Sequence, residues 1–222
     1  MDKKAKAYII FDNDGTLVDS EANFIESMEV LLPKYMGRAV SRKEITDCYV
    51  PDWFQYLKNL GVDNPTPEFV HSMIDDLTAM NENYLPPLFP GIVELLEALK
   101  DLEIATYIWT GRGSKTGLEL FKTHGISHFF HDMQFMDTCT PKPHPDGPTK
   151  MLGTIDKSKI LLIGDSTVDV EGARRFEIPC LIVDWHKKAK SGFFESLGAA
   201  AVVTEPRQVL SWVKQNLLAN TK

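Results

Sequence analysis

Cysteine is scarce in this chain, and the cysteines that are present form no recognisable pattern. The 222 residues include three, Cys48, Cys139 and Cys180, whose spacing matches neither a disulfide scaffold nor a zinc-binding motif. An odd number of scattered thiols is typical of proteins that fold in a reducing compartment. We therefore expect a cytoplasmic protein without a disulfide framework.

Long apolar runs and an excess of positive charge are also missing. The first apolar run, Ala7–Phe11, is too short for a signal peptide or a membrane span, so we expect a soluble protein with no membrane partner. The formal net charge is −7, and no basic stripe offsets it, which argues against a general nucleic-acid binder. The length fits one large domain, or a domain with a smaller insert.

Short apolar runs alternate with longer amphipathic segments through most of the sequence. Ile92, Leu95, Leu96 and Leu99, for example, recur at helical spacing and predict one buried helix face. Alternating strands and helices imply a parallel sheet covered on both faces, which is the doubly wound (Rossmann-like) α/β fold. The predicted strands are Tyr8–Phe11, Ala105–Trp109, Met133–Phe135, Ile160–Ile163, Cys180–Val183 and Ala200–Val203, and the predicted helices between them are Ile92–Leu102, Lys115–His124, Val170–Phe176 and Arg207–Leu218.

The segment Val18–Leu85 interrupts this alternation. It contains no convincing strand, only helix-like stretches such as Ala22–Leu32, and the proline-rich "YLPPLFPG" closes it at Tyr84–Gly91. We therefore predict that this segment forms an all-helical cap, inserted into a catalytic core made of residues 1–17 and 86–222.

Two carboxylates stand one residue apart directly after the first predicted strand. In "YIIFDNDGTLVDS", Asp12 and Asp14 follow the apolar run. Neighbouring carboxylates repel one another and are costly to desolvate unless a cation or a proton intervenes. Ligands of an open α/β sheet bind beyond the carboxyl ends of the strands, so the other strand ends should supply the partners. Those ends carry Thr110 and Gly111, then Lys142 in "TPKPHPDG", then Asp165 and Asp169 in "GDSTVD".

Charge counting predicts what this set of residues binds. Asp12, Asp165 and Asp169 carry three negative charges, which Lys142 and one divalent cation together balance. Carboxylate oxygens arranged this sparsely suit magnesium, which keeps several waters and often shares a substrate phosphate. The sequence therefore predicts a Mg²⁺ cofactor.

The same residues predict a phosphoryl-transfer mechanism. Lys142 and the Thr110 hydroxyl, with backbone N–H groups around Gly111, would hold the phosphate oxygens. Asp12 would attack phosphorus as the nucleophile, and Asp14 would protonate the leaving oxygen as a general acid. We therefore expect a magnesium-dependent phosphatase.

These motifs resemble those of a known family. "DNDGT", the strand-terminal Thr110, Lys142 and "GDSTVD" are similar to the four motifs of the haloacid dehalogenase superfamily of phosphohydrolases, in the same order. The resemblance covers the chain from Ala5 to Val213. An insert straight after the first motif resembles the small helical cap of phosphoglycolate phosphatase-like and β-phosphoglucomutase-like members, and "FPGIVELLEALK" after the insert is similar to that subgroup too.

The resemblance implies specific roles for the site residues. It implies an aspartyl-phosphate intermediate on Asp12. It also implies that magnesium is bound by the Asp12 carboxylate, the Asp14 backbone carbonyl and Asp165. Asp169 would then help to position Lys142 or a metal-bound water.

The chain departs from the family's pattern at two positions in the motifs. Asn13 stands where an apolar residue is commoner, and Thr110 is followed by Gly111 and Arg112 where asparagine is more usual. We expect Arg112 either to reach a substrate or to lie on the surface. Outside the motifs, "WHKK" at Trp185–Lys188 is most simply a solvated loop end.

Other functions use related residues. A phosphomutase would need the same groups and return the phosphoryl group to another hydroxyl of the substrate, and the sequence does not separate it from a phosphatase. An aspartate-phosphorylated signalling domain also combines paired acids with a lysine, but it needs only a single small domain, so the cap and the length argue against it. "TGRGSKTG", with Asp137 beyond it, half-resembles a dinucleotide fingerprint, but a nucleotide cofactor would leave Asp12 and Asp14 unexplained.

We expect the cap to set the size of the substrate. A lid tethered at both ends beside the catalytic edge can close over the phosphate and exclude water. Closure leaves room for a short phosphorylated acid or sugar but not for a folded protein, and an acidic surface repels nucleic acid. The segment Cys48–Trp53 ("CYVPDW") is the candidate loop for contact with the leaving group.

Overall fold

The computed structural model describes residues 5–50, 52–82 and 84–219, and the chain divides into two compact units. One unit holds the described residues up to Asp19 and from Pro87 onward, and the other spans Ser20–Pro86. The sequence predicts the insert at Val18–Leu85, and the function of this segment as a cap stays a prediction. Within the described part of the chain, every helix is too short or too polar to cross a membrane.

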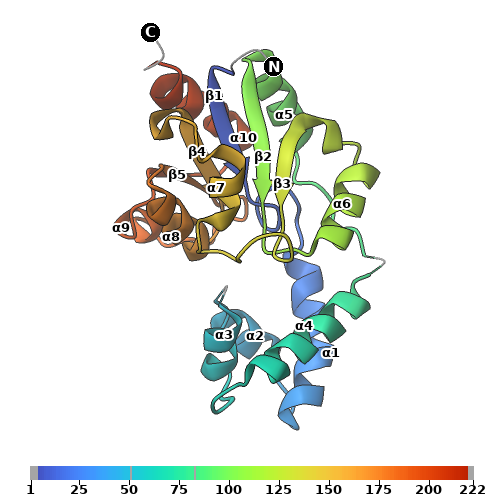
Figure 1. Cartoon of the computed structure of the whole chain (residues 1–222). Helices are drawn as coiled ribbons and strands as arrows, with labels where there is room; N and C mark the ends of the chain where they lie inside the picture. Colours follow the sequence, from blue (N-terminus) through green and yellow to red (C-terminus); the bar gives the residue numbers. More distant parts are fainter. Residues whose placement is uncertain (1–4, 51, 83, 220–222) are drawn as a thin grey trace. The chain divides into compact units, whose positions relative to one another are not determined.

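The first unit is built on a six-stranded parallel sheet. The strand order is β3-β2-β1-β4-β5-β6, and every neighbouring pair runs parallel (Figure 1). The predicted doubly wound α/β fold is confirmed. The strands are β1 (Ala7–Phe11), β2 (Ile104–Trp109), β3 (Phe130–Gln134), β4 (Ile160–Gly164), β5 (Cys180–Val183) and β6 (Ala201–Val203).

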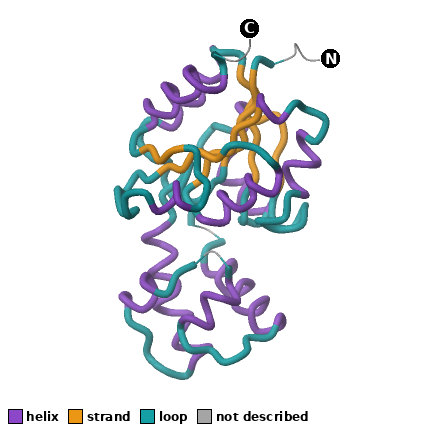
Figure 2. Tube along the Cα trace, turned by 90° about the vertical axis from the view of Figure 1, so that its left-hand side faces the viewer, coloured by secondary structure: helices purple, strands orange, loops and turns teal. Residues whose placement is uncertain are grey.

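Both faces of the sheet are apolar, because alternate side chains along each strand enter different cores. In β1, Ala7, Ile9 and Phe11 belong to one core, whereas Tyr8 and Ile10 belong to the other. Figure 2 shows the strands in orange with purple helices on both sides. The first core is completed by α5 (Ile92–Asp101), α6 (Ser114–Thr123) and α10 (Pro206–Trp212, continued by a π-helical turn at Val213–Leu217). The second core is completed by α7 (Asp146–Leu152) and α8 (Thr167–Phe176). The remaining helical segments are α9 (Phe193–Ser196) and the 3₁₀ turns at Ser127–Phe129 and Lys157–Lys159.

The register of the central strands brings their carboxyl ends level. Phe11 pairs with Ile108 of β2 and with Ile163 of β4. The next backbone N–H, that of Asp12, donates to the Ile163 carbonyl oxygen at 2.8 Å. The residues that follow β1, β2 and β4 therefore emerge at the same edge of the sheet, where ligands of this fold class bind.

The second unit is helical throughout its described secondary structure. Ser41, Asp52 and Thr66 begin three of its helices, and each side chain accepts a hydrogen bond from a backbone N–H in the first turn. Met28, Tyr56 and Met73 lie in an apolar core formed by its described residues. Its helices are α1 (Glu21–Met36), α2 (Arg42–Asp47), α3 (Trp53–Asn59) and α4 (Pro67–Met80).

Strand β3 differs from its sequence prediction. The sequence predicts Met133–Phe135, whereas the strand spans Phe130–Gln134. Because β3 lies at the edge of the sheet, His131 and Asp132 are exposed on it, and its polar start lacks the apolar pattern of a buried strand. The sequence predicts no helix at α2, α7 or α9, because these short helices have too few buried apolar side chains to form a periodic pattern.

Candidate active site

The turn after β1 is closed by Asn13, whose carbonyl oxygen accepts hydrogen bonds from the backbone N–H groups of residues 16–18 at 2.8–3.2 Å. Gly15 has a φ of +77°, in the left-handed region that favours glycine. A Cβ at this position would collide with the Asp165 carboxylate. Glycine therefore lets the loop after β1 approach the residue that follows β4.

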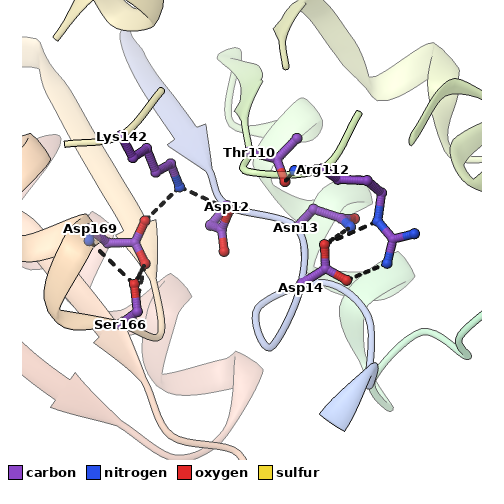
Figure 3. Close-up of polar contacts among 8 residues, drawn as sticks. All are labelled: Asp12, Asn13, Asp14, Thr110, Arg112, Lys142, Ser166 and Asp169. Carbon is purple, nitrogen blue, oxygen red and sulfur yellow. Dashed lines mark hydrogen bonds and ion pairs between the residues drawn. The ribbon is translucent and has the colours of Figure 1, made fainter. Parts of the chain in front are cut away.

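Lys142 bridges two carboxylates at the centre of the site (Figure 3). Its ammonium group donates to Asp12 Oδ1 at 2.9 Å and to Asp169 Oδ1 at 2.6 Å. All three side chains are nearly inaccessible, with 8% of Lys142, 12% of Asp12 and 1% of Asp169 exposed. Burial alone would lower the pKa of Lys142, but the two carboxylates raise it above its ordinary value. Lys142 is therefore charged and fixed between the two acids.

Asp169 is held by Ser166 as well as by Lys142. Its Oδ2 accepts hydrogen bonds from the Ser166 N–H at 3.1 Å and from the Ser166 hydroxyl at 2.6 Å, and the two residues form a capping box at the start of α8. Gly164, which ends β4, makes room for this carboxyl group, because a Cβ there would collide with it. Ser166 is absent from the residues predicted for the site, although "STVD" has the spacing of a capping box.

Asp12, Asp165 and Asp169 form an acidic cluster in which one carboxylate oxygen of each lies within 4.8 Å of the others. Burial raises the pKa of Asp12 to about 7 against the opposing effect of Lys142, and Asp169 adds to the rise. Burial, with Asp12 and Asp169, raises the pKa of Asp165 well above its ordinary value. Three ionised carboxylates and one ammonium group leave two negative charges, which one divalent cation balances. Hard carboxylate oxygens are also the donors that Mg²⁺ prefers, so the cluster fits this ion.

Thr110 stands directly after β2 and is 2% exposed. Its backbone N–H donates to the Gln134 carbonyl at 3.0 Å, and its hydroxyl accepts a hydrogen bond from the Arg112 N–H at 3.1 Å. Gly111, the next residue, is exposed. The structure thus places both residues at the carboxyl end of β2, and their part in phosphate binding stays a prediction.

Asp14 and Arg112 form an ion pair between the loops that follow β1 and β2 (Figure 3). The Arg112 Nε donates to Asp14 Oδ2 at 3.0 Å, and its Nη2 contacts Oδ1. Asn13 Nδ2 also donates to Asp14 Oδ2, at 3.0 Å. Burial lowers the pKa of the Arg112 guanidinium, but Asp14, together with Asp12, raises it above its ordinary value. Only 17% of the Arg112 side chain is exposed, so Arg112 does not lie on the open surface.

Two tryptophans contact the residues of this edge. The indole of Trp109, the last residue of β2, is fully buried, and the Lys142 ammonium lies 5.0 Å from its ring centre. Trp185, which the sequence analysis treats as part of a solvated loop end, is partly buried and donates from Nε1 to the Thr16 carbonyl at 2.8 Å. That prediction was wrong for Trp185, because the contact joins segments far apart in the chain and leaves no local pattern.

Two residues of the glycine-rich stretch after β2 and its acidic partner have structural contacts. Asp137 caps the start of α6, accepting hydrogen bonds from the Ser114 N–H at 2.9 Å and from its hydroxyl at 2.6 Å. Gly117 packs against Phe135, whose ring a Cβ would meet at about 2.5 Å. Both residues therefore have structural roles in this loop.

The candidate substrate loop Cys48–Trp53 connects α2 to α3 in the second unit. The Cys48 carbonyl accepts a hydrogen bond from Asn59 Nδ2 at 3.0 Å, and Trp53 begins α3. Tyr49 is 50% exposed. Pro51 lies outside the described residues, and the role of the loop in substrate contact stays a prediction.

Comparison with known proteins identifies similar chains. A sequence model of the family described as haloacid dehalogenase-like hydrolase matches residues 9–183. The chain is 23% identical over 183 residues to the pyrophosphatase PpaX of Halalkalibacterium halodurans, covering 80% of this chain and 83% of that protein. It is 26% identical over 179 residues to a phosphoglycolate phosphatase of Vibrio parahaemolyticus, covering 75% of this chain and 78% of that protein. A candidate β-phosphoglucomutase from Thermotoga maritima shares the fold with a TM-score of 0.68 and 23% identity, over 94% of this chain and 99% of the other.

Proposed function

Because this chain belongs to the haloacid dehalogenase-like hydrolase family, we propose that it is a magnesium-dependent phosphatase of small phosphorylated metabolites. The observation that carries this proposal is the fixed ion pair of Lys142 with Asp12 and Asp169, beside Asp165 at the carboxyl edge of the sheet. In this pair the buried carboxylate supplies an attacking oxygen, and the lysine supplies a positive charge for the phosphate oxygens.

In this mechanism Asp12 is the nucleophile. One of its carboxylate oxygens forms a bond to phosphorus while the bond from phosphorus to the ester oxygen breaks, which leaves an aspartyl phosphate. Asp14 donates a proton to the departing oxygen. A water molecule then attacks phosphorus and gives a proton back to Asp14, while the bond between phosphorus and the Asp12 oxygen breaks. Inorganic phosphate is released, and the Asp12 carboxylate is restored. Lys142 orients Asp12 and offsets charge on the transferred group.

The chain's own residues determine where magnesium would be held. The Asp12 and Asp165 carboxylates and, as the family resemblance implies, the Asp14 backbone carbonyl would be its protein ligands. When bound, the ion neutralises charge on the phosphoryl oxygens as a Lewis acid. Asp169 already accepts hydrogen bonds from Lys142 and Ser166, so it supports the site by fixing Lys142.

Two of the similar proteins support a small substrate. One is named as a phosphoglycolate phosphatase and the other as a pyrophosphatase, and both names describe compact phosphorylated molecules. We further propose that the helical unit serves as a cap that excludes macromolecular substrates.

A phosphate-release screen tests the function. Purified protein should release inorganic phosphate from small phosphate esters with Mg²⁺, lose this activity in excess chelator and regain it when Mg²⁺ is returned. Ca²⁺ should inhibit, because its looser and larger coordination spoils the alignment of the reacting groups. Comparable turnover of a phosphorylated protein would contradict the size limit, and full activity in chelator would contradict the proposed use of the acidic cluster.

A phosphomutase is the second candidate, because it needs the same nucleophile, acid and lysine and shares the fold. The two activities differ in the fate of the phosphoryl group. A mutase converts a sugar phosphate into its isomer with little inorganic phosphate, whereas a phosphatase releases phosphate in proportion to the substrate consumed. Measuring both products of the same reaction decides between them.

A further inference from the structure

The proposed mechanism does not use the ion pair between Arg112 and Asp14. The guanidinium contacts both Asp14 oxygens, through Nε at 3.0 Å on Oδ2 and through Nη2 on Oδ1. Asn13 Nδ2 adds a third donor, on Oδ2 at 3.0 Å. Both Asp14 oxygens are therefore engaged by side-chain donors, and in this state the carboxyl group contacts Arg112 and Asn13.

Arg112 itself is well placed to bind an anion. The loop that carries it is fixed by hydrogen bonds from the Arg112 N–H to the Thr110 hydroxyl at 3.1 Å and from the Met136 N–H to the Arg112 carbonyl at 3.2 Å. A guanidinium held in place on a rigid loop loses little entropy when it binds, and its planar fork matches a carboxylate or phosphate with two hydrogen bonds. Its present partner Asp14 is 36% exposed, so an anion arriving from solvent can reach the pair.

We propose that Arg112 determines substrate specificity by binding a second anionic group carried on the leaving part of the substrate, and that this group takes the place of Asp14 on the guanidinium. The inference rests on the proposed function, because it concerns the substrate of the same site. The exchange puts one anion in the place of another on Arg112. It releases the Asp14 side chain, which can then turn to the leaving oxygen.

This exchange predicts which esters are good substrates. A phosphate ester that carries a carboxylate or a second phosphate supplies the competing anion, whereas an ester of a neutral alcohol does not. The neutral ester leaves Asp14 engaged with Arg112 and gains no contact from the guanidinium. The structure therefore favours doubly anionic substrates such as phosphorylated hydroxy acids or pyrophosphate.

The experiment compares three substrates with one protein. Phosphoglycolate carries a carboxylate, pyrophosphate carries a second phosphate, and 2-hydroxyethyl phosphate has nearly the shape of phosphoglycolate without its second charge. The wild-type protein should prefer at least one of the two doubly anionic compounds to 2-hydroxyethyl phosphate by roughly 30-fold or more in kcat/KM, as one charged bidentate contact predicts. The preferred compound identifies the source of the anion.

Substitution of Arg112 then tests the residue. In Arg112→Met, kcat/KM on the preferred compound should fall by roughly 30-fold more than kcat/KM on 2-hydroxyethyl phosphate. Arg112→Lys keeps the charge but loses the planar fork of the guanidinium. Its preference for the doubly anionic compound should therefore lie between that of the wild type and that of Arg112→Met. Arg174→Met is the matched control, because Arg174 makes a bidentate pair with Glu171 on the exposed face of α8, with both hydrogen bonds at 2.7 Å.

A binding measurement separates this inference from the proposed function. In the Asp12→Asn background, calorimetry should show that Arg112→Met weakens the binding of phosphoglycolate or pyrophosphate but not the binding of 2-hydroxyethyl phosphate. This result is expected whether or not the wild-type protein hydrolyses these compounds. Equal losses on charged and neutral compounds would show that Arg112 only positions Asp14, and would overturn the inference while leaving the phosphatase intact. Absence of any hydrolysis, with the selective loss of binding preserved, would overturn the phosphatase alone.

Discussion

The ammonium group of Lys142 lies 2.6 Å from Asp169 Oδ1, in an ion pair from which solvent is almost excluded. Removing the lysine leaves Asp12 and Asp169 buried without their shared counter-ion, and breaking a buried pair from one side is strongly destabilising. Lys142→Met should therefore lower the free energy of unfolding by about 3 kcal/mol and abolish turnover. Urea titration of the metal-free protein measures the first effect.

Lys150 provides the matched control for this substitution. It pairs with Asp146 at 3.0 Å on the surface of α7, where 46% of the lysine side chain is exposed. Lys150→Met should cost no more than about 1 kcal/mol. Similar losses in the free energy of unfolding of the two variants would show that burial does not make the Lys142 pair more costly to break than an exposed pair.

Asp12→Asn tests the nucleophile. The amide keeps the shape of the side chain but removes the attacking charge, so kcat should fall by at least about 1,000-fold. The metal-free protein should fold at least as well as the wild type, because the substitution removes one member of a repelling acidic cluster. Retention of more than about a tenth of the activity would contradict the covalent mechanism.

Asp14→Asn separates proton delivery from positioning. Turnover of alkyl phosphates should fall by about 100-fold or more, because their leaving oxygen needs a proton. With p-nitrophenyl phosphate the loss should stay below about 10-fold, because the phenolate leaves without one. A loss of the same size on both kinds of substrate would assign Asp14 to metal binding or positioning alone.

The stability of the metal-free protein should fall as the pH rises. Burial raises the pKa of Asp12 from 3.8 to about 7, so the folded state disfavours the charged form that the unfolded chain adopts readily. The resulting stability is full below pH 3.8 and is lost progressively as the pH rises through about 7. Asp165, whose pKa is raised in the same direction, adds to the loss.

Thermal unfolding at several pH values measures this effect. In chelator, Tm should drop between pH 5 and pH 7.5 by roughly 5 °C more for the wild type than for Asp12→Asn. Addition of Mg²⁺ at pH 7.5 should recover the wild-type loss, because the ion binds the ionised carboxylates of the native state. Identical pH profiles for the two proteins would disprove the assignment to Asp12.

Trp109 and Gly172 should be energetically coupled. A Cβ at Gly172 would lie 2.7 Å from Trp109 Cη2, so Gly172→Ala forces α8 or the indole to move. We expect a loss of about 2 kcal/mol in the wild-type background and a smaller loss in Trp109→Phe, where the ring is shorter. A coupling energy of at least about 1 kcal/mol in the double-mutant cycle, measured by urea unfolding, confirms the contact.

Gly111 supplies the control for that cycle. A Cβ there would meet no atom within 4 Å. Gly111→Ala should therefore change the free energy of unfolding by no more than about 0.5 kcal/mol, in either background. Additive effects of Gly172→Ala and Trp109→Phe would mean that the helix adjusts without strain.

The sequence by itself determined the fold class and selected the residues of the candidate site. Apolar runs of strand length and helices with one apolar face are local patterns, because hydrophobic periodicity depends on residues a few positions apart. Strands such as Cys180–Val183 were therefore placed correctly. The rule that ligands bind beyond the carboxyl ends of parallel strands then selected Asp12, Thr110 and Asp165. Where the local signal is weak, as in the exposed edge strand β3, the sequence was wrong about the start of the element.

Only the tertiary structure decided which of these groups contact one another. Lys142 and Asp12 are 130 positions apart, and Arg112 and Asp14 are 98 apart, so no periodicity links them. The sequence left Arg112 between a substrate contact and the surface, and the fold brought it onto Asp14. The indole of Trp109 under Lys142 is a further product of packing, since the space for it comes from Gly147 and Gly172 on two different helices. Such pairings depend on how strands and helices are placed in space, which hydrophobic periodicity along one segment does not encode.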